Sequence, residues 1–283
     1  ITLKTEHKAV LEPIRQLKKE GFSVTELYPE LDGLISEENL VNALRDDTFL
    51  ISIMLANNEI GVIQPIEKIF KICQKNNIKL HTDAAQCLGY VPMRNFNSLA
   101  NMITLSSHKI YGPKGIGLLI IDEDIQLNPL FYGGGQEFGY RSGTIPLPLI
   151  VGFSKAIELA IKNQERNSTH LASLRDALMN GLLKRNSQIL INGSIFHRLP
   201  HNLNLTVQDI NGPKFHKYIK HQIVCSSGSA CSNGKVSHVL PSIGRSLKEA
   251  ESSVRLSIGL TTTSDEIDKS IAVITETINK LRK

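Results

Sequence analysis

The sequence predicts an α/β protein with a mainly parallel sheet, followed by a smaller α+β region. Short apolar runs alternate with amphipathic helical segments as far as residue 121, whereas the order of helices and strands is mixed beyond residue 185. Regular alternation favours a parallel sheet with right-handed crossovers, and mixed order favours an α+β arrangement. A polar segment at residues 162–167 lies between the two patterns. We therefore expect a large domain at residues 1–162 and a small domain at residues 163–283.

Each element of the first region has its own signal. Val10, Ile14 and Leu17 recur at helical spacing, and Gly21 ends that helix, so His7 lies near its start. Ser36 opens a second helix, and residues 66–75 predict a third. The continuous apolar run at residues 49–55 is typical of a strand buried on both faces. Further strands are expected at residues 24–27, 78–82, 101–105 and 117–121.

The second region begins after a long irregular loop. Residues 129–148 are rich in glycine and proline, which predicts a loop, and residues 149–185 are helical in pattern. The remaining segments predict strands at residues 189–191, 202–207 and 254–258, a strand leading into Cys225, and helices at residues 213–220 and 264–281.

Composition excludes several classes of protein. The 32 Lys and Arg residues outnumber 27 acids and give a net charge of +5, but they are scattered, so we expect no nucleic-acid partner. No apolar run reaches the roughly 20 residues that span a bilayer, so we expect no membrane partner. Four cysteines without a disulfide pattern indicate a reducing, cytoplasmic compartment. The start at Ile1, without methionine, reads as mid-domain sequence, and we expect an upstream part to be missing.

Polar residues follow three of the predicted strands. Asn58, Asp83 and Lys109 come after buried runs, and ligands bind at the carboxyl ends of such strands. A lysine that can form a Schiff base, with an aspartate beside the pyridinium nitrogen, indicates pyridoxal phosphate. The alternatives are an aspartate that caps a loop and a solvated surface lysine.

Other residues are candidates for phosphate or carboxylate binding. Ser106 and His108 flank Lys109 and could contact phosphate oxygens, although turn residues are an equal alternative. The loop at residues 141–144, which ends in Thr144, could hold an anion or be merely flexible. Arg255 could bind a carboxylate with both arms of its guanidinium or be a surface arginine.

One cysteine stands apart from the other three. Cys231 lies in a run of small residues at 226–234, which can hardly pack as core, so we expect an exposed, mobile thiol. Cys73, Cys87 and Cys225 lie in or beside apolar segments and are expected to be inert. The spacing of Cys225 and Cys231 fits zinc poorly, and we expect no metal site.

Taken together, these motifs resemble those of the cysteine desulfurases, the NifS/IscS-like members of the class-V aminotransferase family that supply iron–sulfur cluster assembly. The resemblance covers the chain in order and rests on six segments: residues 6–8, 57–61, 81–86, 106–115, 141–144 and 227–231. It implies the fold type I of pyridoxal-phosphate enzymes, with a seven-stranded type of sheet whose N-terminal part is missing here, and a smaller α+β domain.

The resemblance also implies a role for each residue. Lys109 would carry the pyridoxal 5'-phosphate, Asp83 would pair with its ring nitrogen, and Gln86 would bond its ring oxygen. The other implied roles are ring stacking and proton transfer for His7, contact with the ring oxygen and the substrate carboxylate for Asn58, grip on that carboxylate for Arg255, and phosphate binding for Ser106, His108 and, from the second subunit of a homodimer, Thr144.

The implied reaction converts L-cysteine to L-alanine and leaves a persulfide on Cys231. The implied partners are L-cysteine, a second copy of the chain, and an iron–sulfur scaffold protein or another sulfur acceptor. The segment between Cys231 and Ser237 is shorter than the resemblance leads us to expect. The alternatives are a selenocysteine lyase, another fold type I enzyme, and an inactive truncated scaffold for sulfur-transfer partners.

Overall fold

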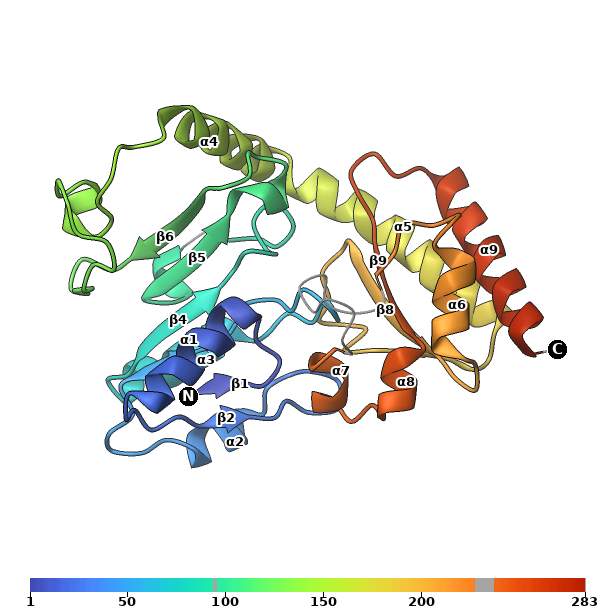
Figure 1. The fold of residues 1–283 in the computed structure, drawn as a ribbon, viewed down its shortest axis with the longest axis horizontal. Helices are drawn as coiled ribbons and strands as arrows, with labels where there is room; N and C mark the ends of the chain where they lie inside the picture. Colours follow the sequence, from blue (N-terminus) through green and yellow to red (C-terminus); the bar gives the residue numbers. More distant parts are fainter. Residues whose placement is uncertain (94–95, 227–236, 283) are drawn as a thin grey trace.

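The chain forms two lobes that are joined by a long helix. The computed structural model describes residues 1–93, 96–226 and 237–282. One lobe is built around a six-stranded sheet and the other around a three-stranded sheet, with α5 (Gln164–Arg185) running from the first lobe into the second (Figure 1). The two predicted patterns of secondary structure therefore correspond to two separate sheets.

The larger sheet is mainly parallel, as predicted. Its spatial order is β2-β1-β3-β4-β5-β6, and only β6 runs antiparallel to its neighbour β5. The resemblance implies a seven-stranded type of sheet, and six of its strands lie within the described residues. The strands are β1 (Thr2–Leu3), β2 (Glu26–Leu27), β3 (Leu50–Ser52), β4 (Lys79–Asp83), β5 (Met102–Ser106) and β6 (Gly117–Ile121).

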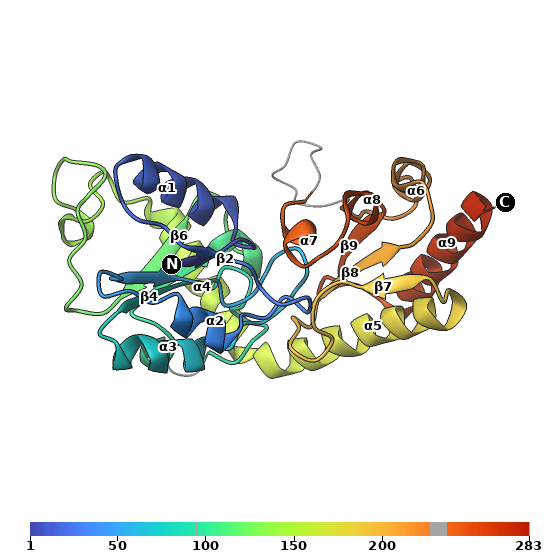
Figure 2. The ribbon, with the colours of Figure 1, turned by 90° about the horizontal axis from the view of Figure 1, so that it is seen from below.

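Helices lie on both sides of this sheet. Figure 2 shows α1 (Lys8–Lys19) on one side and α2 (Glu37–Asn42) with α3 (Ile66–Lys75) on the other. The expected helix starts are confirmed, because His7 and Ser36 are the N-caps of α1 and α2. The periodicity of α3 places Ile66, Ile69, Phe70 and Cys73 on one buried face. Burying each of its large apolar side chains contributes about 1.5–3 kcal/mol.

The connections carry short 3-10 helices and one further long helix. The 3-10 helix η2 (Ser107–Ile110) follows β5 and contains Lys109. The loop after β6 leads to α4 (Leu147–Lys162), and α5 begins after a break at Asn163, inside the polar segment expected to separate the domains. Two further 3-10 helices among the described residues are η1 (Phe96–Ser98) and η3 (Glu137–Gly139).

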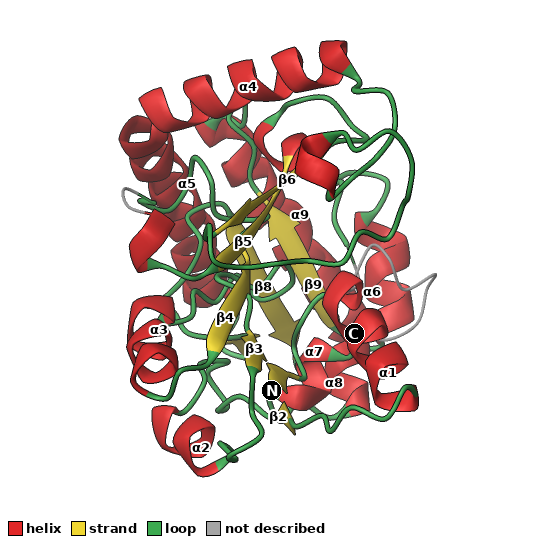
Figure 3. Ribbon diagram, turned by 90° about the vertical axis from the view of Figure 1, so that its left-hand side faces the viewer, coloured by secondary structure: helices red, strands yellow, loops and turns green. Residues whose placement is uncertain are grey.

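The smaller lobe packs an antiparallel sheet against helices. The sheet has the order β7-β8-β9, and α9 packs against α5 and α6. Figure 3 shows the strands inside the molecule and the helices around them. Its elements are β7 (Ile189–Ile191), β8 (Asn202–Val207), α6 (Gly212–Ile219), α7 (Val239–Ser242), α8 (Leu247–Glu251), β9 (Ser253–Ser257) and α9 (Ser264–Arg282).

Each lobe has its own hydrophobic core. Leu80, Ile103 and Phe153 belong to one buried cluster, and Leu171 and Phe215 belong to another. A third, smaller cluster joins the lobes, because Ile60 and Val62 from the first pack with Val239, Leu240, Ile243 and Ala250 from α7, α8 and the turn between them. This third cluster fixes the lobes against each other beside the carboxyl ends of the large sheet.

One prediction about the second region was wrong, and two short helices were missed. The segment leading into Cys225 is not a strand, since only Ser226 pairs, through an isolated antiparallel bridge to Arg255. Helices α7 and α8 were not predicted, because four or five residues are too few to show a helical period. Among the described residues, no helix is long and apolar enough to cross a membrane.

Candidate active site

Asp83 and Lys109 lie at the carboxyl ends of two neighbouring strands of the large sheet. Asp83 is the last residue of β4, and Lys109 lies in η2, directly after the neighbouring parallel strand β5. The carboxyl ends of parallel neighbours point the same way, so the predicted convergence of these residues follows from the strand pairing. Lys109 is exposed and Asp83 is half-buried, so both can reach a bound molecule.

Asp83 supplies a fixed negative charge. One carboxylate oxygen accepts the backbone N–H of Ala85 at 2.9 Å, and the Asp83 carbonyl accepts that of Leu55 at 2.9 Å. Burial raises the pKa of the Cys87 thiol, and the Asp83 carboxylate raises it further. A carboxylate held in this way suits a protonated ring nitrogen. Gln86 is half-buried in the turn that follows Asp83.

The other side of Lys109 is positively charged and suits an anion. Ser106 Oγ and His108 Nδ1 are 3.0 Å apart, so these two candidate phosphate-binding side chains lie together. Burial lowers the pKa of His108, and the charges of Lys109 and Lys114 lower it further. Hydroxyl, imidazole and ammonium groups form a suitable donor set for a phosphate. Together with Asp83 and Gln86, these residues fit pyridoxal phosphate in their chemistry.

A glycine after Lys109 permits the tight turn of this motif. Ser107 is fully buried, and a Cβ on Gly112 would clash with its side-chain oxygen. Tyr111 ends η2 in the left-handed conformation at φ 64°, and its hydroxyl accepts the Leu260 N–H at 3.1 Å. The segment that carries Lys109 is therefore held by the small lobe as well as by the sheet.

Asn58 and Arg255 are brought together across the two lobes. Arg255 Nη1 donates to the Asn58 carbonyl at 3.0 Å. Within the part of the chain that the structure describes, no hydrogen bond uses Arg255 Nε or Nη2, so both can bind a carboxylate. Arg255 is the third residue of β9.

His7 is placed by the start of α1. Its Nδ1 accepts the Ala9 N–H at 3.2 Å, so the proton of the neutral ring is on Nε2. The preceding residue, Glu6, is fully buried, and one of its carboxylate oxygens accepts the Met54 N–H at 2.7 Å.

Two predicted residues are not in this cluster. Thr144 is exposed in the loop between β6 and α4, and no hydrogen bond joins it to the residues above among those described. Cys231 lies outside the described residues, although Ser226 before it and Ser237 after it are placed. No group of three or more His, Cys, Asp or Glu side chains that could hold a metal occurs in the described part of the chain.

Sequence reasoning missed the aromatic contacts beside Lys109. The ring centroids of Tyr90 and His201 are 4.2 Å apart, and the ring planes are tilted by 42°. Burial lowers the pKa of His201 to about 4, and the charges of Lys109 and Arg175 act in the same direction. His201 follows the apolar pair Leu199-Pro200, which gives no sequence signal for a buried imidazole.

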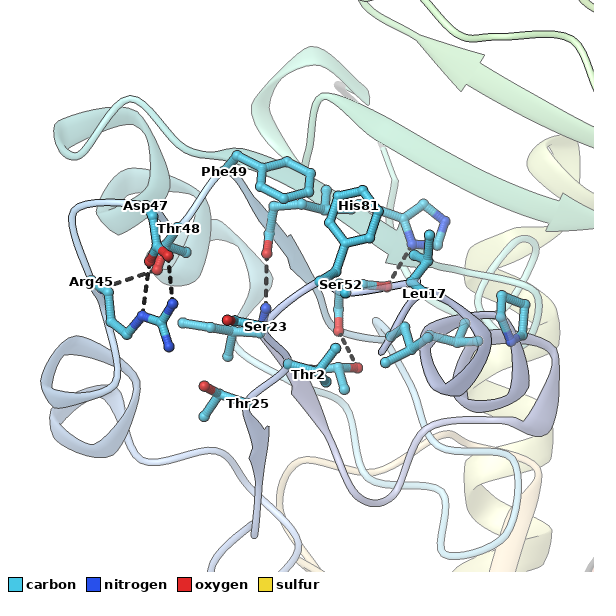
Figure 4. Close-up of a pocket in the computed structure, with 18 of the residues that line it drawn as sticks. Thr2, Leu17, Ser23, Thr25, Arg45, Asp47, Thr48, Phe49, Ser52 and His81 are labelled. Carbon is cyan, nitrogen blue, oxygen red and sulfur yellow. Dashed lines mark hydrogen bonds and ion pairs between the residues drawn. The ribbon is translucent and has the colours of Figure 1, made fainter. Parts of the chain in front are cut away.

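The structure also contains two cavities outside this cluster. One, of 490 Å³, is lined by residues of α1 and of strands β1, β3 and β4 (Figure 4). At its edge His81 Nδ1 is 2.8 Å from Ser52 Oγ, as drawn there, and His81 Nε2 is 2.9 Å from Thr104 Oγ1. The other, of 590 Å³, lies beside Tyr111, Leu260 and the start of α5. Neither is lined by Asp83 or Lys109.

Comparisons with known proteins agree with this architecture. The model of the family "Aminotransferase class-V" matches residues 1–269. The cysteine desulfurase IscS of Histophilus somni (strain 2336) is 44% identical and covers 100% of this chain, which spans 70% of that relative. The mitochondrial cysteine desulfurase of Eremothecium gossypii is also 44% identical over the whole chain, which spans 58% of its length.

Solved structures show the same relationship. A NifS-like protein superposes with a TM-score of 0.90 at 34% identity, over 99% of this chain and 74% of its own. A NifS-like protein of Rickettsia africae gives a TM-score of 0.86 at 31% identity, over 98% of this chain and 75% of its own. The chain belongs to the class-V aminotransferase family and, within it, to the cysteine desulfurases.

Proposed function

We propose that this chain is a cysteine desulfurase that uses pyridoxal 5'-phosphate. The observation that carries the proposal is the placement of Lys109 and Asp83 at the carboxyl ends of two neighbouring parallel strands, in a member of this family. The overall reaction is L-cysteine plus the Cys231 thiol, giving L-alanine plus the Cys231 persulfide, in which atoms and electrons balance. We also propose residues 1–162 and 163–283 as its two domains.

The proposed cofactor contacts follow from the donor set. Lys109 would bind the aldehyde, Asp83 the ring nitrogen, Gln86 and Asn58 the ring oxygen, and Ser106 with His108 the phosphate. His7 would stack on the ring. When bound, the cofactor would supply an electron sink for the carbon that loses its proton.

The remaining chemistry belongs to the protein side chains. Arg255 would orient the substrate through its carboxylate, because Nε and Nη2 are available for a bidentate contact. Lys109 would move the proton at the substrate Cα, and His7 would assist through its Nε2–H. Cys231, as thiolate, would attack the substrate sulfur, so that an S–S bond forms while the C–S bond breaks.

A homodimer is part of the proposal. The loop between β6 and α4 exposes large apolar side chains, including Leu130, Tyr132 and Phe138, which are 88%, 85% and 98% exposed. An exposed apolar group of this size is unusual on a monomer and typical of an interface. The dimer would bring Thr144 of each chain to the phosphate site of the other.

Further parts of the proposal are the acceptor and the compartment. The persulfide would pass to an iron–sulfur scaffold protein or another sulfur acceptor. Three free cysteines among the described residues, Cys73, Cys87 and Cys225, support a reducing compartment, and we propose the cytoplasm.

The test is to incubate the purified protein with pyridoxal phosphate and L-cysteine, and to measure alanine and the persulfide on Cys231. We expect Lys109→Ala to lose alanine formation and the visible absorbance of bound cofactor, and the matched exposed variant Lys71→Ala to keep both. Cys231→Ala should bind the cofactor but form no protein persulfide. Equal alanine formation by the wild type and Lys109→Ala would refute the assignment.

A further inference from the structure

The larger of the two cavities described above lies where the junction of α4 and α5 meets the segment that carries Lys109. Its volume is 590 Å³, which falls within the ~300–1,000 Å³ typical of sites for small organic ligands. The two residues after Lys109, Ile110 and Tyr111, form part of its wall. Asn163, at the break between the two helices, forms another part. Lys109 and Asp83 do not line it, so the cavity is separate from the candidate active site.

The floor of this cavity is apolar. Leu88, Ile110 and Ala156 line it and are buried, so the floor belongs to the packed interior. Leu159 lines the same cavity from α4 but is 47% exposed, and a ligand seated there would cover it. Each Å² of apolar surface that the ligand and the cavity remove from water contributes about 25 cal/mol. The cavity therefore favours a ligand with an apolar body.

The rim of the cavity is cationic. Arg166 and His170 lie at positions i and i+4 of α5, so their side chains share one face of the helix. Both are exposed, and within the part of the chain that the structure describes neither side chain has a hydrogen-bond or ion-pair partner. None of the described residues that line the cavity is an aspartate or a glutamate. An unpaired guanidinium beside an apolar floor suits a ligand that ends in a carboxylate.

Tyr111 connects the cavity to the segment that carries Lys109. Its hydroxyl accepts the Leu260 N–H at 3.1 Å and is hydrogen-bonded to the side chain of Tyr90. These three residues all line the cavity, so a bound ligand would contact the groups that hold η2 against the small lobe. A ligand that binds the folded state disfavours local opening of the segments it contacts, so occupancy should stabilise η2.

We propose that this cavity is a second binding site, which takes a small carboxylate with an apolar body of about ten carbon atoms. Arg166 would hold the carboxylate, and the floor at Leu88, Ile110 and Ala156 would pack against the apolar body. The site takes no part in the proposed conversion of L-cysteine and is separate from the groups assigned to pyridoxal phosphate. Binding here can therefore be measured whether or not the chain forms alanine.

The test uses decanoate as the probe, with the purified full chain in the presence of pyridoxal phosphate. Isothermal titration calorimetry should give one saturable site with a dissociation constant of about 1 mM or tighter, as expected for a ligand of this size. Decanamide, which lacks the charge, and decylammonium, which reverses it, should each bind at least about threefold more weakly. Absence of saturable binding, or an affinity that does not depend on the charge of the probe, would overturn the proposal.

Variants of α5 locate the site. Arg166→Gln should weaken decanoate binding at least about threefold, the effect of losing one charged pair at an exposed position. Arg185→Gln, exposed at the other end of the helix, should leave the affinity unchanged. Asn167→Phe places a ring in the cavity and should abolish binding, whereas the matched Asn180→Phe, at an exposed position, should not. Equal affinities in the two arginine variants, or undiminished binding by Asn167→Phe, would show that decanoate binds elsewhere.

Amide hydrogen exchange gives a readout that needs no turnover. Decanoate should slow exchange at residues 107–112 and 159–170 of the wild type, because residues of both stretches line the cavity. The same addition should leave exchange in Asn167→Phe unchanged. Protection that is confined to other segments of the chain would refute the site.

Discussion

Arg255 Nη1 donates a 3.0 Å hydrogen bond to the carbonyl oxygen of Asn58, and this bond joins β9 of the small lobe to the loop that follows β3. The guanidinium is thereby oriented before any substrate arrives. Its other N–H groups are then presented without a search through side-chain rotamers, which lowers the entropic cost of binding a carboxylate.

Replacing Arg255 by Lys should weaken substrate binding. Lysine keeps the charge but loses the planar fork, so we expect KM for L-cysteine to rise by about 10- to 100-fold, corresponding to the ~1.5–3 kcal/mol of a hydrogen bond to a charged group. Steady-state alanine formation measures it. The control Arg15→Lys changes an exposed arginine on α1 that is paired with Glu12 and should leave KM unchanged. An unchanged KM in Arg255→Lys would remove Arg255 from the substrate site.

Asp83→Asn should abolish most of the activity. The amide keeps an acceptor for the Ala85 N–H but carries no charge to hold a proton on the ring nitrogen. We expect the rate of alanine formation to fall by at least about 100-fold, on the order of 3 kcal/mol in the barrier. The measurement is alanine formation at saturating cofactor, with Asp124→Asn, at an exposed carboxylate paired with Lys79, as the control. Full activity in Asp83→Asn would contradict the proposed role.

His201 should make the free energy of unfolding decrease at acidic pH. Its folded pKa, about 4, is below its unfolded value, so the unfolded chain binds one more proton between these two values. Stability is therefore present above the unfolded pKa of about 6.5 and falls as the pH drops toward 4. From pH 7 to pH 5 we expect this group to remove about 2 kcal/mol.

The variant His201→Phe keeps an aromatic ring against Tyr90 and removes the titration. Urea unfolding at pH 7 and pH 5 measures the free energy of unfolding, which should decrease less between these two pH values in this variant than in the wild type. His170→Phe, at an exposed position on α5, should behave like the wild type. If the free energy of unfolding decreased equally from pH 7 to pH 5 in His201→Phe and in the wild type, the role of His201 would be refuted.

The stability of the Glu6→Gln variant should fall less at alkaline pH than that of the wild type. The folded pKa of this buried carboxyl is raised, so the native state holds a proton that the unfolded chain releases. The stability of the wild type should therefore fall as pH rises above the unfolded pKa, while glutamine has no proton to lose. Unfolding midpoints at pH 5 and pH 8 test this, with Glu38→Gln, at an exposed residue of α2, as the control. A variant whose midpoint follows the wild type at both pH values would show that Glu6 is charged in the native state.

The exposed aromatic residues of the β6–α4 loop should hold the dimer. Replacing Tyr132 and Phe138 by Ser removes apolar area that would be buried between two chains, and we expect the dissociation constant to rise at least about tenfold. Analytical ultracentrifugation over a concentration series measures it. As a control, replacing the exposed Phe196, in a loop of the small lobe, by Ser should leave the dimer dissociation constant unchanged. A monomeric wild type would refute the dimer.

Most strands, most helices and the cluster at the sheet edge could be predicted from the sequence because each has a local signal, whereas the two-residue strand β1 (Thr2–Leu3) is too short to give one. The apolar runs before Asp83 and Lys109 fix two parallel strands, and parallel pairing alone brings the ends of those strands together. The helix starts at His7 and Ser36 were likewise predictable, because an N-cap is a short-range hydrogen bond.

The sequence by itself determined the α/β class, the order of the elements and the identity of the residues at the sheet edge. Tertiary structure alone decided which residues meet across the lobes: Arg255 with Asn58, His238 with Glu6, Tyr111 with Leu260, and Tyr90 with His201. The physical reason is distance along the chain. Periodicity and turn chemistry act over a few residues, whereas these contacts form between segments separated by roughly a hundred residues or more, and only the packing of the two cores against each other brings them together.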